Sequence, residues 1–194
     1  MARYTGPRDK IIKKLGLSRL PGLRNAAITQ KNKFGKKSVN QYKTRMQEKQ
    51  KLKYHYGVTE RQMVQYFLKA KRAKGSTADR LLIELEMRLD NIVFRLGLTP
   101  TIRAARQMVT HGHINVNNKK MRAPGYACKP GDEIQINKQL IQTRSTTSSE
   151  CTAVTERARH LILQENGGRV AGFARKRSLP MRINDLLVVE YYSK

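Results

Sequence analysis

The chain has 194 residues, and its 40 lysines and arginines against 14 acidic residues give a formal charge of +26. That length accommodates one or two domains with a modest core, and so large an excess of one charge repels itself in a free compact protein. The composition therefore argues against an ordinary basic soluble protein and predicts a permanent polyanionic partner, while the lack of a long apolar run or lipidation motif argues against a membrane-surface protein.

Residues 1–53 are predicted to form a basic N-terminal extension that leads into a first helix. Residues 1–74 hold 21 of the lysines and arginines but only 3 acids. No signal peptide is expected, because Ile11 and Ile12 run directly into two lysines. Residues 25–40 lack periodicity and hold few apolar residues, so we expect them to order only on RNA. The expected RNA contacts here are Arg3, Arg8, Lys10, Lys13, Lys14, Lys31, Lys33, Lys36 and Lys37.

Two helices are predicted in a helical body at residues 41–87. The first ends at Gly57 and carries a mostly basic face, while the second opens at Thr59, which has capping-box spacing with Gln62. An apolar stripe that includes Met63 and Phe67 predicts the buried side of the second helix. The tyrosines of the helical body can either stack on RNA bases or pack in a core. The RNA-binding candidates of this body are Arg45, Lys49, Lys53, Arg72 and Lys74.

A single helix is predicted up to Gly97, because leucines and other apolar residues recur at spacings of three and four from Leu81 to Leu96. Ser76 or Thr77 is expected to cap its start. A second helix follows, capped by Thr101 and ended by Gly112.

Beyond Gly112 apolar residues recur at every second position, which predicts strands of a small antiparallel sheet. Asn117 and Asn118 can adopt the positive φ of a tight hairpin turn, and Lys129–Asp132 (KPGD) predicts another turn before a strand. Cations on the exposed helix face and on the hairpin form a clamp for a polyanion. The candidates are Arg88, Arg95, Thr101, Arg103, Arg106, Gln107, His111, His113, Asn117, Lys119 and Lys120, with a packing role for His113 left open.

Neither a catalytic centre nor a metal site is predicted. Asp90 has no second carboxylate or nucleophile beside it, so we expect it to pair with a neighbouring arginine and orient it. Cys128 and Cys151 are too few for a four-ligand zinc site and are expected to be free or buried thiols. We therefore expect no zinc, no other cofactor and no enzymatic activity.

The remainder of the chain is harder to interpret. Residues 144–152 are rich in Ser and Thr and predict a linker, and residues 154–166 predict a helix that ends at Gly167. A final apolar segment, MRINDLLVVEYYSK, closes the chain. The role of residues 139–178 stays open.

Three separated motifs resemble a known family. They are RLDN at residues 88–91, RAARQMVTHGHINVN at residues 103–117 and KPGD at residues 129–132. Together they resemble the S4 RNA-binding domain, and ARYTGPRDKIIKKLG, EKQKLKYHYGVTERQ and INDLLVVEYYSK extend the likeness to the S4 family of small-subunit ribosomal proteins, of plastid and cyanobacterial type.

The resemblance implies an α+β fold, in which an S4 domain at residues 88–150 is inserted in a helical body and residues 151–194 return to that body. It implies a structural constituent of the small ribosomal subunit that binds 16S-type rRNA and nucleates assembly of the subunit body. It also implies a place beside the channel by which mRNA enters, a contribution to translational accuracy, and protein neighbours S5 and, as a further candidate, S3. The implied location is the chloroplast, with a cyanobacterial cytoplasm as the alternative.

Two other classes of protein carry the same domain. An RNA-modifying enzyme needs a catalytic domain, but only about 75 lysine-rich residues precede the motifs here, which is short for a separate domain. A small stress-related RNA binder would not require the N-terminal helical body or the C-terminal INDLLVVEYYSK segment.

Overall fold

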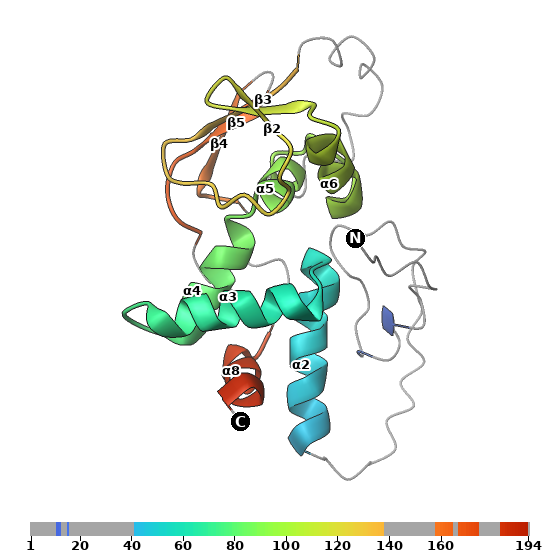
Figure 1. Ribbon diagram of the computed structural model, residues 1–194, viewed down its shortest axis with the longest axis vertical. Helices are drawn as coiled ribbons and strands as arrows, with labels where there is room; N and C mark the ends of the chain where they lie inside the picture. The colour runs from blue at the N-terminus through green and yellow to red at the C-terminus, as the bar shows by residue number, and fades with distance from the viewer. Residues whose placement is uncertain are drawn as a thin grey trace. The chain divides into compact units, whose positions relative to one another are not determined.

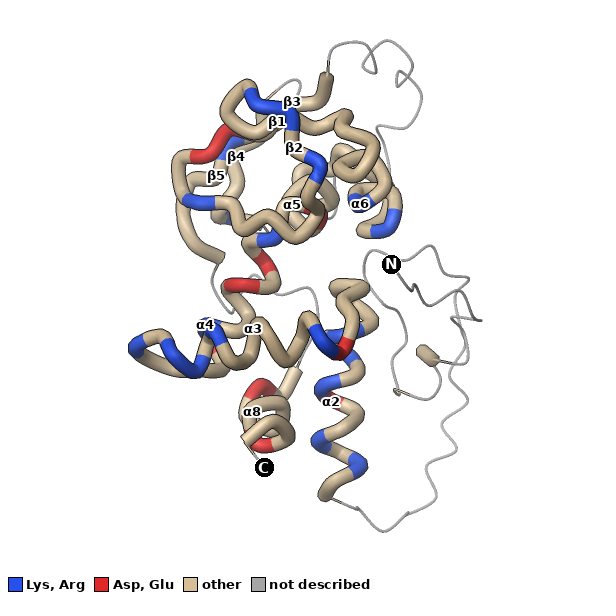
Figure 2. Tube along the Cα trace, in the orientation of Figure 1, with Lys and Arg blue, Asp and Glu red and all other residues tan. Residues whose placement is uncertain are grey.

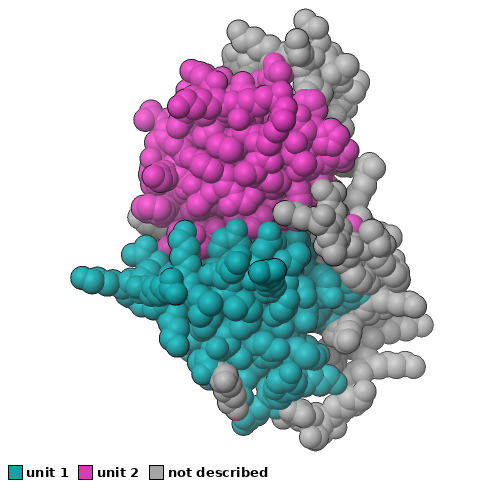
Figure 3. Space-filling model, in the orientation of Figure 1, with its two compact units in different colours: residues 1–81, 181–194 teal, residues 82–180 magenta. Residues whose placement is uncertain are grey.

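The computed structural model describes residues 11–12, 15, 41–137, 158–164, 167–174 and 183–193. The chain divides into two compact units, coloured separately in Figure 3. Unit 1 comprises residues 1–81 and 181–194, and unit 2 comprises residues 82–180.

Unit 1 contains helices α2 (Gln41–Tyr56), α3 (Glu60–Arg72) and α8 (Asp185–Ser193) (Figure 1). The predicted end of α2 is confirmed, since Gly57 has the positive φ of 60° that such a terminus favours. The capping box of α3 is also confirmed. The Gln62 amide donates to the Thr59 hydroxyl at 3.3 Å, and the Thr59 amide donates to the Gln62 side chain at 3.1 Å.

Helix α8 packs against α2, although more than 120 residues separate them in the chain. Val188 of α8 is buried, as are Leu52 of α2 and Met63 and Phe67 of α3. The Tyr192 ring stacks on Phe67 at a centroid distance of 5.1 Å. Aromatic and aliphatic packing thus joins the two ends of the unit.

The single helix predicted before Gly97 is wrong, because the structure has two: α4 (Thr77–Glu86) and α5 (Leu89–Arg95). Arg88 between them is extended and forms a β-bridge with Ala127. The Leu89 amide donates to the Tyr126 carbonyl at 2.9 Å. A distant segment therefore satisfies the backbone groups that the helical ladder would have used.

Unit 2 continues with α6 (Ile102–Thr110) and a five-stranded antiparallel sheet in the order β2-β1-β3-β5-β4. The predicted hairpin is confirmed: Val116 pairs with Lys119, and the two asparagines of the turn have φ of 49° and 63°. Apolar residues of α5, α6 and the sheet form one core. The strands are β1 (Ile114–Val116), β2 (Lys119–Met121), β3 (Glu133–Ile136), β4 (Leu161–Gln164) and β5 (Gly167–Val170).

The helix predicted at residues 154–166 is wrong where the structure describes it, because β4 and β5 form a hairpin there. A Cβ on Gly168 would overlap the Leu96 side chain, so this strand needs glycine to lie against α5. Strands β4 and β5 therefore complete the sheet of unit 2, which moves the predicted boundary at residue 150. Of the predicted C-terminal segment, α8 belongs to unit 1.

Among the described helices, none has the length and apolar character needed to cross a bilayer.

Candidate nucleic-acid interface

The exposed face of α6 carries three of the predicted RNA-binding residues. Arg103, Gln107 and His111 follow one another at a spacing of four, which places them on one side of the helix. All three are exposed, whereas Ile102, Ala105 and Val109 on the opposite side are buried. The amphipathic pattern thus directs donors outward along the whole helix.

The β1–β2 hairpin brings more cations to the C-terminal end of this helix. Lys119 and Lys120 are exposed on β2, and Arg122 follows them. Gly112 has φ of 75°, and a Cβ there would overlap the Lys120 side chain and lie 3.3 Å from Arg122 Nε. The cations of β2 therefore lie directly over the turn that ends α6, and Figure 2 shows basic residues on both elements.

Two histidines lie at the same end of α6. His111 is exposed and His113 is half-buried, with their ring centroids 5.9 Å apart. We call the exposed side chains of Arg103, Gln107, His111, Lys119, Lys120 and Arg122 the α6–β2 surface. Arg122 is not among the residues predicted to bind RNA, although its closeness in sequence to Lys119 and Lys120 is a signal for it.

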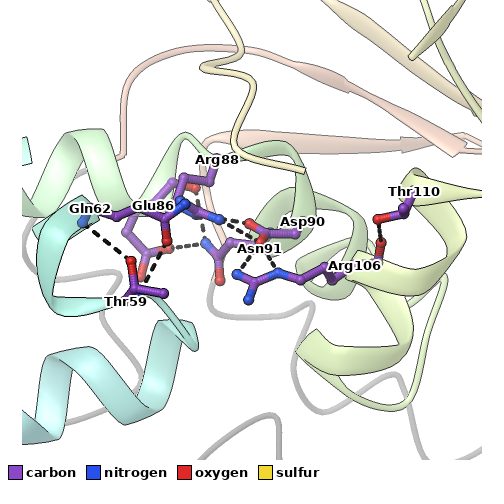
Figure 4. Close-up of polar contacts among 8 residues, drawn as sticks. All are labelled: Thr59, Gln62, Glu86, Arg88, Asp90, Asn91, Arg106 and Thr110. Carbon is purple, nitrogen blue, oxygen red and sulfur yellow. Dashed lines mark hydrogen bonds and ion pairs between the residues drawn. The ribbon is translucent and has the colours of Figure 1, made fainter. Parts of the chain in front are cut away.

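Helix α6, which carries part of the α6–β2 surface, is held by Asp90, whose exposed fraction is only 1%. Figure 4 shows this carboxylate between Arg88 and Arg106. Arg88 donates to both carboxylate oxygens of Asp90, at 3.0 and 2.7 Å. Arg106 of α6 donates to Oδ2 at 3.1 and 2.7 Å. The prediction that Asp90 pairs with a neighbouring arginine is confirmed, and the pairing with Arg106 fixes α6 to the start of α5.

Arg88 and Arg95 do not face RNA, which corrects the prediction for both. Their exposed fractions are 2% and 1%. Arg95 donates to both oxygens of Glu86 at 2.7 and 2.8 Å, and Asn91 donates to the same carboxylate at 2.8 Å (Figure 4 shows Asn91 and Glu86). A guanidinium sealed against a carboxylate cannot reach a phosphate, so the RLDN motif is a buried scaffold.

Three further candidates use their polar groups within the fold. Arg106 is 15% exposed and engaged by Asp90. The Asn117 amide group donates to Asp132 at 2.9 Å and accepts from the Glu133 amide at 2.9 Å. The Thr101 hydroxyl accepts from the Ala104 amide at 3.1 Å and caps α6, as predicted. The side chains of these three residues therefore hold the elements of the α6–β2 surface in place.

The basic face predicted for α2 turns inward, toward α8 and Glu60. Lys49 is 5% exposed and donates to Glu60 at 2.8 Å, with its ammonium 4.3 Å from the centre of the Tyr191 ring. Arg45 pairs with Glu190 at 2.7 Å, and Lys53 pairs with Glu60 at 3.2 Å. The prediction that Lys49 contacts RNA is therefore wrong, because Glu60 of α3 pairs with this lysine and tyrosines of α8 cover it.

Both members of the Lys49–Glu60 pair have pKa values shifted toward their charged forms. Burial works to raise the pKa of Glu60, but hydrogen bonds from Lys49, Tyr192 and Lys53 outweigh it and hold that pKa below its ordinary value. Burial likewise works to lower the pKa of Lys49, but hydrogen bonds to Glu60 and Tyr191 raise it overall. The pair is thus an ionic contact that stabilises unit 1.

Four exposed cations of unit 1 gather at the end of α3. Arg72 and Lys74 are exposed, and so are Lys69 and Lys71, which were not among the candidates although they belong to the same run. The remaining candidates lie outside the described residues: Arg3, Arg8, Lys10, Lys13, Lys14, Lys31, Lys33, Lys36 and Lys37.

The described residues contain no cluster of three or more His, Cys, Asp and Glu side chains that could hold a metal ion. Cys128 is a free, buried thiol, and burial raises its pKa to about 12. The thiol form therefore prevails at neutral pH. Cys151 lies outside the described residues.

Sequence comparisons place this geometry in a known class. The S4 domain profile matches residues 87–134, which contain α5, α6, strands β1 and β2 and the start of β3. The profile of the ribosomal protein S4/S9 N-terminal domain matches residues 3–86. The chain is therefore an S4-domain protein with the N-terminal domain of a ribosomal S4 protein.

Full-length relatives identify the family. The chain is 49% identical to small ribosomal subunit protein uS4c of Mesostigma viride over 206 residues, and 48% identical to that of Chaetosphaeridium globosum over 209 residues. It is 47% identical to that of Marchantia romanica over 202 residues. Each comparison covers 100% of this chain and 99% of the relative. The chain belongs to the uS4 family of small ribosomal subunit proteins.

Proposed function

We propose that the protein is a structural constituent of the small ribosomal subunit that binds 16S-type rRNA and nucleates assembly of the subunit body. The observation that carries this proposal is the α6–β2 surface, where exposed cations and hydrogen-bond donors gather on an S4 domain. Phosphate contacts of this kind position a protein on folded RNA without reading much sequence. No catalytic step is part of the proposal.

The proposed RNA-binding residues are those of the α6–β2 surface with His113, Arg72 and Lys74 at the end of α3, and the basic N-terminal residues. Arg103 and the two lysines of β2 donate to phosphates, and Gln107 and the histidines add further hydrogen-bonding groups. The run at the end of α3 gives a second contact in unit 1. The proposed set is Arg72, Lys74, Arg103, Gln107, His111, His113, Lys119, Lys120, Arg122 and the candidates of residues 1–37.

We further propose that the protein acts in chloroplasts, beside the channel by which mRNA enters the ribosome, with proteins S5 and S3 as neighbours. The location is supported by the names of the relatives, which denote the chloroplast protein. The place beside the mRNA and a contribution to translational accuracy follow from the family resemblance. They concern the assembled particle rather than any single described side chain.

The test is a salt titration of rRNA binding by the double variant Lys119→Ala/Lys120→Ala. If each lysine neutralises one phosphate, the slope of log K against log salt should fall in magnitude by about 2. Lys43→Ala/Arg61→Ala is the matched control, because it removes two exposed cations outside the α6–β2 surface.

An equal loss of slope in the control would mean that overall charge, and not this surface, determines binding. Independently, the wild-type chain should sediment with small ribosomal subunits through a high-salt wash. A chain released in that wash would contradict the proposed role.

A further inference from the structure

The two edges of the unit 2 sheet have opposite chemistry. Strand β2 forms one edge and exposes Lys119 and Lys120, which suits a strand that must not pair with another. Strand β4 forms the other edge and has the sequence Leu-Ile-Leu-Gln, with no charged side chain. Ile162 and Leu163 are each 54% exposed. One edge is protected by lysines, whereas the other is neutral and apolar.

The backbone at the β4 edge points outward at Leu163. The Val170 amide donates to the backbone carbonyl of Asp132 at 2.9 Å, toward β3. The Ala171 amide donates to the backbone carbonyl of His160 at 2.8 Å, toward β4. Antiparallel strands direct the groups of successive residues to opposite sides. The register Ile162↔Arg169 therefore turns the backbone groups of Ile162 toward β5 and those of Leu163 away from it. Within the described chain, no strand lies beyond β4.

An outward amide and carbonyl flanked by exposed apolar side chains match an extended polypeptide. A nucleic acid is a poor occupant, because its charged backbone would leave the apolar side chains of Ile162 and Leu163 uncovered. A second copy of this chain is disfavoured by repulsion between two molecules that each carry +26. The neighbouring Arg159 and Arg169 are exposed and favour an acidic residue in the incoming segment. The edge thus selects protein over RNA and an acidic or neutral segment over a basic one.

We propose that the β4 edge receives an extended, neutral or acidic segment of another protein, which adds a sixth strand to the sheet. The segment donates and accepts at Leu163 and covers the side chains of Ile162 and Leu163. This surface goes beyond the RNA-binding role, and it rests on the proposed function only in that the partner is sought inside the small ribosomal subunit.

The test combines site-specific cross-linking with hydrogen exchange in assembled subunits. A photo-reactive amino acid replaces Leu163 in one chain and Lys119 in a second. We expect the probe at position 163 to attach to one protein, identified by mass spectrometry, and the probe at position 119 to attach to rRNA. The Leu163 amide should also exchange more slowly after assembly, by about tenfold or more, if it gains one hydrogen bond.

A variant tests the backbone contact itself. Leu163→Pro removes the outward amide at an edge position, where proline is tolerated. With the photo-reactive probe at Ile162, this change should lower the yield of the protein cross-link by about tenfold, whereas Leu163→Val should not.

Sedimentation separates the two proposals. A chain that does not sediment with subunits contradicts the proposed function. A chain that sediments overturns the β4 inference if the probe at position 163 attaches only to rRNA or to nothing. Unchanged exchange of the Leu163 amide overturns it equally.

Discussion

The cations of unit 2 form two groups that differ in where they lie and what they contact. Arg88 and Arg95 are buried and hold the carboxylates of Asp90 and Glu86. Arg103, Lys119 and Lys120 lie exposed on α6 and β2. A buried guanidinium requires a carboxylate, because an unpaired charge in the interior is costly, whereas an exposed cation remains hydrated until a phosphate replaces the water. The first group builds the domain and the second binds its partner.

Helix α2 repeats the contrast in unit 1. Lys49 is buried between Glu60 and Tyr191, whereas Lys43 is exposed earlier on the same helix. A high net charge alone therefore overestimates the RNA-binding surface. The distinction between the two groups can be tested by substitution.

Removal of the Asp90 carboxylate should have the largest effect. Asp90→Ala leaves Arg88 buried without its carboxylate and releases Arg106, so the free energy of unfolding should fall by about 3–5 kcal/mol. Urea denaturation measures this loss of unfolding free energy. Arg103→Ala is the matched control and should change the same quantity by less than about 0.5 kcal/mol. Similar losses of unfolding free energy in both variants would contradict the distinction between buried and exposed cations.

Lys49→Met should have the next largest effect, because it keeps the aliphatic stem but loses the ion pair with Glu60. A loss of about 2 kcal/mol is expected for a charged hydrogen bond in this setting. Lys43→Met on the same helix should lie within about 0.5 kcal/mol of wild type. Thermal and urea unfolding of the two variants compare them directly. A stable Lys49→Met variant would count against a structural role for this lysine.

Arg106 shares features of both groups of cations, because its side chain is 15% exposed and also pairs with Asp90. Arg106→Ala should cost about 1.5 kcal/mol of stability, because Arg88 still neutralises Asp90. It should also weaken rRNA binding through a misoriented α6. Arg103→Ala should weaken rRNA binding and reduce its salt dependence without affecting stability. Loss of affinity without loss of stability in Arg106→Ala would place Arg106 in the exposed group.

His160 gives the smallest effect, and it depends on pH. Burial lowers its pKa below 6.5, Glu86 opposes that shift and Arg95 adds to it. The native state therefore holds neutral His160, and the unfolded chain takes up the proton first as pH falls. Stability from this group is complete above about pH 6.5 and declines below it, by less than about 1.4 kcal/mol per pH unit for one proton.

Urea unfolding between pH 5 and 8 measures that decline. His160→Leu should flatten the pH dependence, because it removes the buried imidazole. A profile that His160→Leu does not alter would assign the acid sensitivity to other groups.

Local chemistry predicts the parts of the fold that depend on a few adjacent residues. The Thr59 and Thr101 caps, the turn at Asn117 and Asn118, and the helix end at Gly57 were correctly predicted from side-chain type alone. Each is stabilised by contacts within about four residues. The exposed face of α6 also follows from its periodicity.

Long-range partners determine the parts that the sequence did not predict. The break at Arg88 depends on hydrogen bonds to residues near Tyr126, and the β5 strand depends on β3. Arg95 is buried because Glu86 lies on the preceding helix, and Lys49 because α8 covers it. An arginine or lysine alone carries no signal that distinguishes these sites from phosphate contacts. Only the position of the acid in three dimensions does so.

The pairing of α2 with α8 has a consequence for how the chain is made. Unit 2 is one uninterrupted stretch of sequence, so it can fold on the nascent chain as soon as residue 180 has left the exit tunnel. Unit 1 must wait, because α8 is translated after all of unit 2. Until then Lys49 and its neighbours on α2 lack their cover, and a newly made molecule presents more positive charge to RNA than the mature one.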